Sequence, residues 1–467
     1  MGQPVSKIRA AKLELYRKQG KIHAKAVSGR FNSLRWLCVG LTQIIFYGAC
    51  WLNWPANGQL RQAVHFDIAH EKLYLFGLVL WPQDALLLAL VLLIAATGLF
   101  LTTALAGRLF CGFLCPQTVY TSMFTWIEAR VEGDHLARLQ LDRGPLTLNK
   151  IVRKTLKHVL WAALAAWTAI TFVGYFTPIR ELLPTLADWQ VGPWEAFWLI
   201  FYAAFTYVQA GLAREAVCQH MCPYSRFQGV MFDPATRSVA YDSKRGEPRS
   251  SQRRSSPAGD CIDCGICVEV CPTGIDIRDG LQYACINCGL CIDACDQVMT
   301  RIGAPTGLIR FASENELAAM PRQAWFRRPR VIAYAALLLV FAFLGGWTVS
   351  RHAELRFDVL RDRGVLARET ADGQVENAYT LQVMNLTEEA QEFAVAVVGD
   401  GKLQIVGPNT VSAAPGSIAP LQVTVAAPAG ALPAGTHALR FHVFSPAQPA
   451  LHAEEASTFR MPEATGR

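Results

Sequence analysis

Twelve of the 14 cysteines fall into four groups whose spacing suits metal ligation. Two of the groups follow the pattern C-x2-C-x2-C-x3-C, the spacing by which bacterial ferredoxins hold [4Fe–4S] clusters. In that arrangement three thiolates of one loop bind three corners of a cluster, and the last cysteine of the other loop binds the fourth corner. The crossover predicts one cluster on Cys261, Cys264, Cys267 and Cys295 and another on Cys285, Cys288, Cys291 and Cys271.

Zinc ions and disulfides are the alternatives for these eight cysteines. Structural zinc sites usually pair two C-x2-C units about 15–20 residues apart, and do not need three closely spaced cysteines twice. A reducing cytoplasmic location disfavours disulfides. Asp296 follows the second motif where Pro is expected, which changes a turn but removes no ligand. We therefore predict two [4Fe–4S] clusters.

The other two groups share the rarer pattern C-x3-C-P: Cys111 with Cys115 before Pro116, and Cys218 with Cys222 before Pro223. If each pair lies on one helix, residues i and i+4 are neighbours, and two thiolates can bind one metal ion. If the proline begins a new helix, the pair lies in a loop. Soft thiolates select Cu(I), zinc or iron–sulfur clusters, and buried structural cysteines are the alternative. His220 and Met221 are further possible ligands, whereas we interpret Cys38 and Cys50 as packing residues.

The elements that must position these cysteines lie largely in a membrane. Charged residues make up 17% of the chain against about 25% in soluble domains, and hydrophobic residues make up 52%. This composition excludes disordered and collagen-like chains and disfavours an ordinary soluble enzyme. Five stretches without Asp, Glu, Lys or Arg approach the about 20 residues that cross a bilayer: residues 36–54, 85–106, 159–179, 196–213 and 331–350.

The basic residues between these stretches predict the orientation, because Lys and Arg resist translocation. The segments before and between the five stretches contain 9, 2, 8, 1 and 15 Lys and Arg residues in chain order. We therefore expect the N-terminus, both C-x3-C-P motifs and the ferredoxin-type motifs on the cytoplasmic side of a bacterial inner membrane. Five crossings then leave the tail in the periplasm, and its nine Lys and Arg residues do not prevent this because long domains cross largely regardless of charge.

Two further segments are neither apolar stretches nor cysteine motifs. One precedes the ferredoxin-type motifs, and the other is the tail after the last apolar stretch. Residues 242–260 are rich in Ser, Pro, Gly and Arg and are typical of a flexible tether. No aromatic platform accompanies this basic run, so we do not predict nucleic-acid binding. In the tail, short alternating segments such as Tyr379-Thr-Leu-Gln-Val and Phe441-His-Val-Phe, separated by Gly/Pro/Asn turns, predict an Ig-like β-sandwich without cysteines.

The predicted fold is therefore a multi-domain membrane protein: an α-helical bundle of about five spans, a two-cluster ferredoxin-like α+β domain and a C-terminal Ig-like β-sandwich. The expected domains are a basic N-terminus (1–35), a four-span membrane domain (36–213), the linker with the ferredoxin-type domain (214–330), a fifth transmembrane helix (331–350) and the periplasmic sandwich (351–467).

With these motifs in this order, the chain resembles the cytochrome c oxidase accessory protein family CcoG, also called FixG or RdxA. The likeness runs nearly end to end and includes Leu78-Val-Leu-Trp-Pro-Gln-Asp, Cys222-Pro-Tyr-Ser-Arg-Phe-Gln and Tyr241-Asp-Ser-Lys-Arg-Gly-Glu-Pro. The resemblance implies a role in assembling the cbb3-type haem–copper oxidase, reduction of Cu(II) to Cu(I), and oxidase assembly factors or copper chaperones as partners.

The residues suit this chemistry, since each cluster transfers one electron and thiolates favour Cu(I). We assign the eight ferredoxin-type cysteines as the relay, and Cys111, Cys115, Cys218 and Cys222 as the copper-handling site, with copper as substrate or transient ligand. Two alternatives stay open: a polyferredoxin that only relays electrons to a partner, as NapH- and NosR-like proteins do, and an assembly scaffold without redox activity. The sequence does not identify the electron donor.

Overall fold

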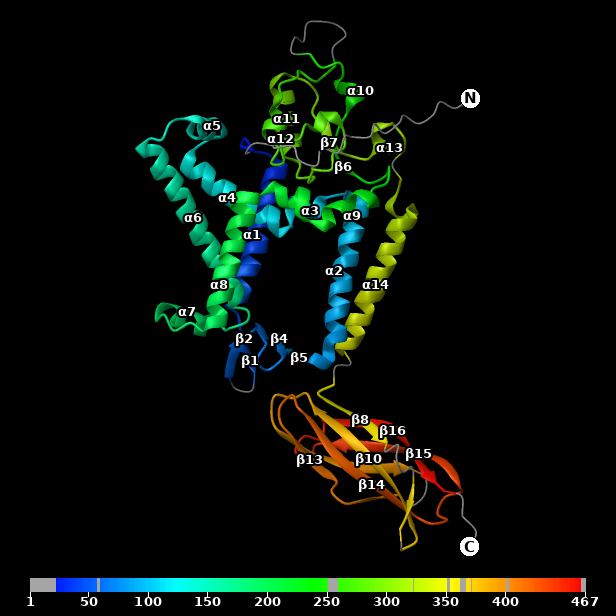
Figure 1. Cartoon of the computed structure of the whole chain (residues 1–467). Coiled ribbons are helices and arrows are strands. Elements are labelled where there is room, and N and C mark those ends of the chain that lie inside the picture. Colours follow the sequence, from blue (N-terminus) through cyan, green and yellow to red (C-terminus); the bar gives the residue numbers. More distant parts are fainter. Residues whose placement is uncertain are drawn as a thin grey trace. The chain divides into compact units, whose positions relative to one another are not determined.

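The computed structural model describes residues 22–56, 59–250, 259–321, 323–350, 353–361, 367–370, 372–399 and 403–462 (Figure 1). Two compact units are present. The first comprises Met1–Leu80 and Leu88–Phe343, and the second comprises Trp81–Leu87 and Leu344–Arg467. All 12 motif cysteines belong to the first unit.

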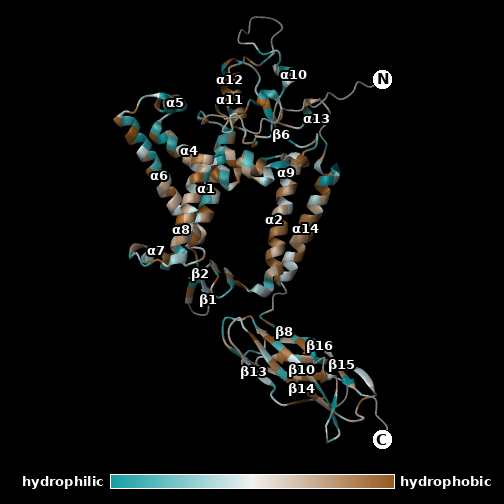
Figure 2. Ribbon diagram, in the orientation of Figure 1, coloured by the Kyte–Doolittle hydropathy of each residue, from teal (hydrophilic) through white to brown (hydrophobic). Residues whose placement is uncertain are grey.

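Four of the described helices are long and apolar enough to cross a membrane: α2 (Ala85–Ala106), α6 (Leu148–Val173), α8 with its continuation (Pro193–Ala213) and α14 (Pro329–Ser350). None of these helices buries more than 39% of its most apolar window inside the protein, so most of their apolar side chains face outward. Figure 2 shows the hydrophobic colour along α2 and α14. Apolar surface of this extent on a helix is stable in lipid rather than in water.

Four of the five predicted spans correspond to these helices, with shifted bounds in some cases. The predicted third span, 159–179, is displaced, because α6 ends at Val173 and Ile179 already begins α7 (Ile179–Ala187). The predicted first span, 36–54, corresponds to α1 (Arg30–Ala49), which is not among the four helices. Its last predicted residues lie in a strand instead, since Asn53 begins β1. The number of five spans therefore stays a prediction.

Two small antiparallel sheets follow α1 and were not expected from the sequence. One pairs β1 (Asn53–Ala56) with β2 (Gln59–Gln62), and the other contains β3 (Val64–Asp67), β4 (Lys72–Leu75) and β5 (Leu78–Leu80). The buried Gln62 amide joins these sheets to the end of α6, donating to the carbonyl of Gly174 at 2.8 Å and accepting from the N–H of Ile179 at 3.0 Å.

A buried network of charges fixes the segment between α2 and α6, which forms α3 (Leu109–Phe113), α4 (Pro116–Glu132) and α5 (His135–Arg143). Glu128 and Glu132 lie on α4 without solvent exposure. Glu132 pairs with Lys157 of α6 at 2.9 Å, and Glu128 pairs with Arg214 at 2.8 Å. Breaking such a buried pair leaves an uncompensated charge, so these contacts constrain how the helices pack.

The ferredoxin-type part of the first unit packs on the start of α1. It contains β6 (Ser238–Tyr241), α10 (Ser243–Gly246), α11 (Ile266–Glu269), α12 (Leu290–Arg301), β7 (Ile309–Ala312) and α13 (Glu314–Leu317), with β6 and β7 paired. The carboxylate of Asp293 on α12 accepts the backbone N–H groups of Phe31 and Asn32 at 3.2 and 2.8 Å. These N–H groups belong to the first turn of α1, so a side chain of the ferredoxin-type part caps α1.

The prediction of a flexible tether over residues 242–260 is wrong for its described parts. Asp242 caps the short helix α10, and the Arg310 guanidinium pairs with it at 2.9 Å. Arg245 donates to Asp260 and to the carbonyls of Pro305 and Thr306. These bonds hold the basic segment against the ferredoxin-type core, and the middle of the predicted tether, residues 251–258, lies outside the described residues.

The second unit is the predicted β-sandwich. One sheet has the order β12-β14-β10-β8 with β9 paired to β10, and the other has the order β13-β11-β15-β16. The predicted strands correspond to β10 (Gln374–Asn385), β11 (Gln391–Gly399), β14 (Ile418–Pro428) and β15 (Gly435–Phe444), and the others are β8 (Leu355–Arg361), β9 (Arg368–Glu369), β12 (Gln404–Val406), β13 (Thr410–Ala413) and β16 (His452–Met461). Phe393, Phe441 and Phe459 are fully buried in its core, and each contributes roughly 1.5–3 kcal/mol by leaving water.

Candidate functional site

The first C-x3-C-P motif is a break between two helices. Cys111 lies in the short α3, and Cys115 has an extended backbone and precedes Pro116, the first residue of α4. Proline suits this position because its fixed φ matches the helix and its missing N–H would have no partner there. The pair therefore does not share one helix face: Pro116 begins a new helix, as the alternative expected, but Cys111 lies in a short helix of its own rather than in a loop.

The second C-x3-C-P motif repeats this geometry. After α8 the chain continues as two π-helical segments, Tyr207–Ala213 and Val217–Met221, with Arg214 between them at a φ of 44°. Cys218 lies in the second segment, and Cys222 is extended and precedes Pro223, the first residue of α9 (Pro223–Met231). Such π-helical turns are rare and frequently mark functional sites.

The four cysteines of the two motifs lie in one region. Cys115 interacts electrostatically with Cys222, and Cys218 with both Cys111 and Cys115. Burial raises the pKa of the Cys111 thiol to about 11 and that of Cys218 to about 12, so a metal ion must displace a proton to bind either one. Among the described residues, no three His, Cys, Asp or Glu side chains lie close enough to hold one metal ion. The region therefore offers thiols in proximity rather than a preformed three-ligand site.

The ferredoxin-type cysteines surround two hollows. One is lined by Cys261, Cys264, Cys267 and Cys295, together with apolar side chains such as Leu308. The other is lined by Cys271, Cys285, Cys288 and Cys291, with Cys267 also at its border. Each hollow thus gathers the set of four cysteines that the crossover predicts. Thiolates of a cubane bind different iron atoms and lie farther apart than the ligands of a single ion, so the donor set fits two [4Fe–4S] clusters, and the ligand assignment stays a prediction.

The first C-x3-C-P motif touches the loop of the second cluster motif directly. A Cβ atom built on Gly112 would lie 2.7 Å from the carbonyl oxygen of Ile286 and 3.0 Å from Cα of Cys288. The Cys111 side chain packs against the buried group that contains Ile286 and Cys288. Only glycine allows the two backbones to approach this closely. One of the copper-handling candidates is therefore next to predicted ligands of the second cluster.

Arg108 joins the two C-x3-C-P motifs to the cluster loop and was missed by sequence reasoning. Its buried guanidinium donates to the carbonyls of Tyr283 and Cys285 and, at 2.7 Å, to that of Ser225 in α9. Ser225 in turn donates to the carbonyl of Cys222 at 2.9 Å. Its place three residues before Cys111 was the available signal, but nothing in the spacing shows that this arginine is buried.

Two amides complete the arrangement and were also missed. The fully buried Gln228 of α9 contacts the Cys111 sulfur, with its Nε2 at 3.4 Å. Asn287, between Cys285 and Cys288, accepts the N–H of Val239 at 3.3 Å and contacts the Cys285 sulfur through the same Oδ1 at 3.6 Å. Hydrogen bonds to cluster sulfurs and their surroundings are a known control on reduction potential.

The remaining candidates are the two cysteines near α1 and two residues of the second C-x3-C-P motif, His220 and Met221. Cys50 is buried against Val173, Ile179 and Leu182, and Cys38 is half-buried on α1, in keeping with packing roles. His220 and Met221 are exposed, and neither belongs to a group of described residues that could hold a metal ion.

Three family models match the chain. Residues 213–314 match a model described as a 4Fe-4S dicluster domain, and residues 88–132 match one described as a 4Fe-4S binding domain. Residues 345–462 match the Ig-like fold at the C-terminus of FixG. These matches support iron–sulfur cofactors and identify the sandwich as the Ig-like domain of this family.

Curated relatives match over most of the chain. The nitrogen fixation protein FixG of Rhizobium meliloti is 34% identical over 97% of this chain and 95% of its own length. The protein RdxB of Cereibacter sphaeroides is 38% identical over 84% of each chain. The ferredoxin-type protein NapH of Escherichia coli is 24% identical over 52% of this chain and 87% of its own length. The chain is thus an iron–sulfur electron-transfer protein that belongs to the FixG/RdxA family.

Proposed function

We propose that this protein reduces Cu(II) to Cu(I) at the membrane in support of cbb3-type oxidase assembly. The observation that carries the proposal is the contact between the first C-x3-C-P motif and the second cluster loop, where Gly112 meets the backbone of Ile286. Electrons held by the predicted clusters would have a short path to the thiols that we assign to copper. The four-cysteine region is the place where copper would accept them.

The chemistry of the step suits the groups present. Reduction of Cu(II) to Cu(I) takes one electron, and a [4Fe–4S] cluster supplies one electron at a time. The thiolate side chains of Cys111, Cys115, Cys218 and Cys222 are soft ligands that favour Cu(I) over Cu(II). Two such ligands suffice for Cu(I), which accepts low coordination numbers, so the lack of a three-ligand group among the described residues is no obstacle.

The location and partners complete the proposal. The charge alternation supports a bacterial inner-membrane protein with the cysteine motifs on the cytoplasmic side and the sandwich in the periplasm. The family resemblance supports oxidase assembly factors or copper chaperones as recipients of Cu(I).

A pure electron relay is the second candidate, and the similarity to NapH favours it. In a relay the clusters would pass electrons to a partner protein, and Cys111, Cys115, Cys218 and Cys222 would have no affinity for copper. The two functions therefore differ in what the C-x3-C-P cysteines bind.

The test is the double variant Cys111→Ser/Cys115→Ser, with Cys38→Ser as the matched control in α1. Serine keeps the size of the side chain but removes the soft ligand. We expect the double variant to keep its iron and its membrane insertion while Cu(I) retention falls about tenfold, which corresponds to about 1.4 kcal/mol. The rate of Cu(II) reduction by dithionite-reduced protein should fall with it, and Cys38→Ser should match the parent.

Iron content, Cu(I) retention and Cu(II) reduction are measured on the same preparation. Full copper binding in the double variant would remove these cysteines from the mechanism. Parent protein that holds reduced clusters but neither binds Cu(I) nor reduces Cu(II) would favour the pure relay. Loss of folded protein would indicate buried structural thiols whose hydroxyl replacements lack partners, and the Cys218→Ser variant would then carry the test from the other motif.

A further inference from the structure

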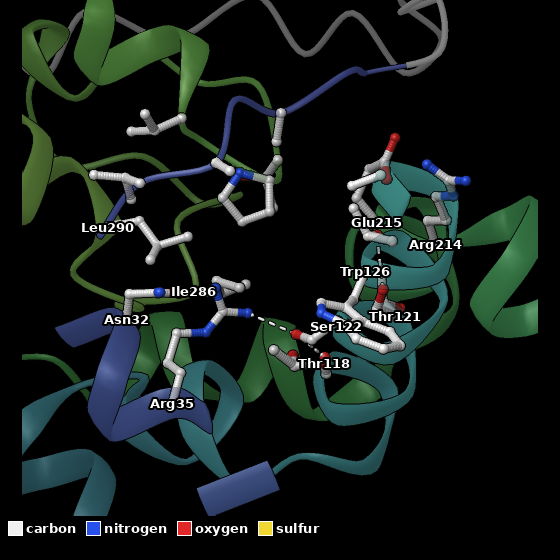
Figure 3. A pocket seen from close by; sticks show the side chains of 18 of the residues that line it. Asn32, Arg35, Thr118, Thr121, Ser122, Trp126, Arg214, Glu215, Ile286 and Leu290 are labelled. Carbon is white, nitrogen blue, oxygen red and sulfur yellow. Dashed lines mark hydrogen bonds between the residues drawn. The ribbon is translucent and has the colours of Figure 1, made fainter. Parts of the chain in front are cut away.

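A cavity of about 220 Å³ lies between the helices and the second cluster loop (Figure 3). Figure 3 shows Asn32 and Arg35 of α1 on one side and Thr118, Ser122 and Trp126 of α4 on the other. Arg35 crosses to α4, where it donates to the hydroxyl of Ser122 at 3.0 Å. The size suits one substituted aromatic ring rather than a large cofactor, since pockets for drug-sized ligands run from about 300 Å³ upward.

The residues that close the cavity on one side are sequence neighbours of the predicted ligands of the second cluster. Val270 and Pro272 flank Cys271, Ile286 follows Cys285, and Leu290 precedes Cys291. A molecule in the cavity would therefore be separated from that cluster by about one layer of side chains. Cys218 of the second C-x3-C-P motif also lines the cavity.

The polar groups of the cavity favour a ligand with electron-rich oxygen atoms. Four cationic side chains line it, together with the carboxylate of Glu215: Lys25, Arg35, Arg138 and Arg214. Carboxylates outside the lining pair with three of them, Glu269 with Lys25 at 3.3 Å and Glu128 with Arg138 and Arg214 at 3.6 and 2.8 Å. Arg138 is 2% exposed, and its Nη2 donates to the carbonyl of Ala24 at 2.7 Å. Its Nη1 lies 3.6 Å from the Glu128 carboxylate, and its Nε has no hydrogen-bond acceptor among the described residues. Buried donors of this kind are rare and call for a ligand or another explanation.

The other lining groups favour an apolar aromatic molecule taken from the membrane. Trp36 and Trp126 meet edge to face at 6.5 Å and are about half exposed, and tryptophans of this kind gather at membrane–water interfaces. Gln117 lines this cavity and also a second, apolar one of about 370 Å³ between α1, α4, α6 and α8. That second cavity offers aromatic and aliphatic side chains, such as Phe172 and Phe205, to a hydrocarbon chain.

We propose that the cavity bounded by α1, α4 and the second cluster loop binds the headgroup of a membrane quinol, which is the electron donor of this protein. Oxidation of one quinol to the quinone releases two electrons and two protons. Two one-electron clusters take one electron each, and the protons pass to the carboxylate of Glu215 and to water. Arg138 would donate its Nε–H, which has no acceptor among the described residues, to a ring oxygen. This inference rests on the proposed function for the fate of the electrons, but not for the binding of the quinol.

Glu215 is placed to accept a proton in this step. It lines the cavity next to Arg214, and no side chain of the described residues forms an ion pair with it within 4.0 Å. Burial raises the pKa of its carboxyl above the ordinary range, although the charge of Arg214 opposes this. A carboxyl with a raised pKa beside a redox site is a typical proton acceptor.

The test uses purified full-length protein and the short-chain analogue decylubiquinone. Ala129 of α4 lines the cavity, so Ala129→Phe fills it, whereas Ala163→Phe adds the same bulk to an exposed position of α6 outside it. We expect decylubiquinone to quench tryptophan fluorescence with saturation near one molecule per chain. Ala129→Phe should weaken this binding at least about tenfold, and Ala163→Phe should bind like the parent. Glu215→Gln should still bind the quinone but slow cluster reduction by decylubiquinol.

Iron content and Cu(II) reduction by dithionite-treated protein are measured on every preparation. Ala129→Phe with intact iron and normal dithionite-driven copper reduction, but without quinone binding, supports the site. Equal binding by parent, Ala129→Phe and Ala163→Phe overturns it, as does an absence of quinone binding in parent protein with intact iron. If vesicles with anionic lipid protect the tryptophans and the quinone does not, the cavity is a lipid site and the proposal is wrong. Failure of copper reduction with normal quinone binding would instead count against the proposed function alone.

Discussion

Cys271 belongs to the first cysteine motif in the sequence but is a predicted ligand of the second cluster. It ends the first C-x2-C-x2-C-x3-C motif, yet it lines the hollow that Cys285, Cys288 and Cys291 surround. The Cys271 sulfur lies 3.3 Å from the hydroxyl of Thr273. The predicted exchange of last cysteines would tie the two loops together, because neither cluster would be complete without the other loop.

Cys271→Ala should therefore damage the cluster of the following motif. Anaerobically purified parent protein should contain about eight iron atoms, and the variant should lose about half of them. The surviving electron paramagnetic resonance signal of the reduced protein should match that of a Cys285→Ala variant, and should differ from that of a Cys264→Ala variant. The opposite pairing of spectra would show that each motif keeps its own last cysteine, and a zinc-only parent preparation would contradict the clusters altogether.

The sequence does not reveal which polar side chains are buried. Cysteine spacing identifies ligands because the geometry of a cubane constrains it. Arg108 and Gln228 have no such spacing, and a polar side chain in isolation is more often exposed than buried. Arg108 is buried because three carbonyls from two segments, those of Tyr283 and Cys285 in the cluster loop and of Ser225 in α9, converge on it. Such convergence depends on the tertiary structure.

At the scale of elements, the short helix α3 is the joint between the membrane helices and the cluster loop. Gly112 is its contact residue, and the atoms facing it belong to the backbone of Ile286, Asn287 and Cys288. Backbone atoms cannot rotate away as the end of a flexible side chain can. A methyl group at this position must push the cluster loop away from the first C-x3-C-P motif.

Gly112→Ala should therefore destabilise the first unit by about 1–3 kcal/mol, the usual cost of overpacking. Gly229→Ala is the matched control, because Gly229 lies in α9 and a Cβ there meets nothing within 4 Å. The control should be neutral or slightly stabilising, since alanine is the better helix former. Thermal unfolding and retained iron are measured on both variants, and an unaltered Gly112→Ala protein would show that the two backbones can separate freely.

Long apolar helices and alternating strands are the elements that the sequence predicts well. α2 has the predicted bounds, and four predicted strands of the sandwich correspond to β10, β11, β14 and β15. The strand β16 was missed because it begins with His452-Ala-Glu-Glu, which has no apolar alternation. Its backbone pairing with β15, which the sequence pattern does not reveal, makes it a strand. The small sheets after α1 were missed for a similar reason, since Gln62 holds them through contacts with residues far along the chain.

At the scale of the whole chain, the number of crossings decides on which side the sandwich lies. α1 is not among the four strongly apolar helices, but segments before and after it contact segments before and after α6. Before α1, His23 contacts Asp142 at 3.0 Å, just ahead of the start of α6. After α1, the N–H of Phe66 donates to the carbonyl of Tyr175 at 2.7 Å, just beyond the end of α6. Because the segments that flank α1 contact the segments that flank α6, α1 should cross the same layer as α6, which favours five spans.

Alkaline phosphatase fusions test this directly, because the enzyme is active only after export. We expect activity when it is fused after His70, which follows α1, and when it is fused after Ser350, the last residue of α14. Fusion after Gly259, next to the first cluster motif, should give no activity.

If α1 does not cross, the segment around His70 lies on the same side as the N-terminus. With the N-terminus inside the cell, the fusion after His70 would then be inactive. The fusions after Gly259 and Ser350 would then exchange their outcomes, because three crossings rather than four would precede the cluster motifs. The same three fusions thus decide both the status of α1 and the compartment of the clusters, on which copper reduction inside the cell depends.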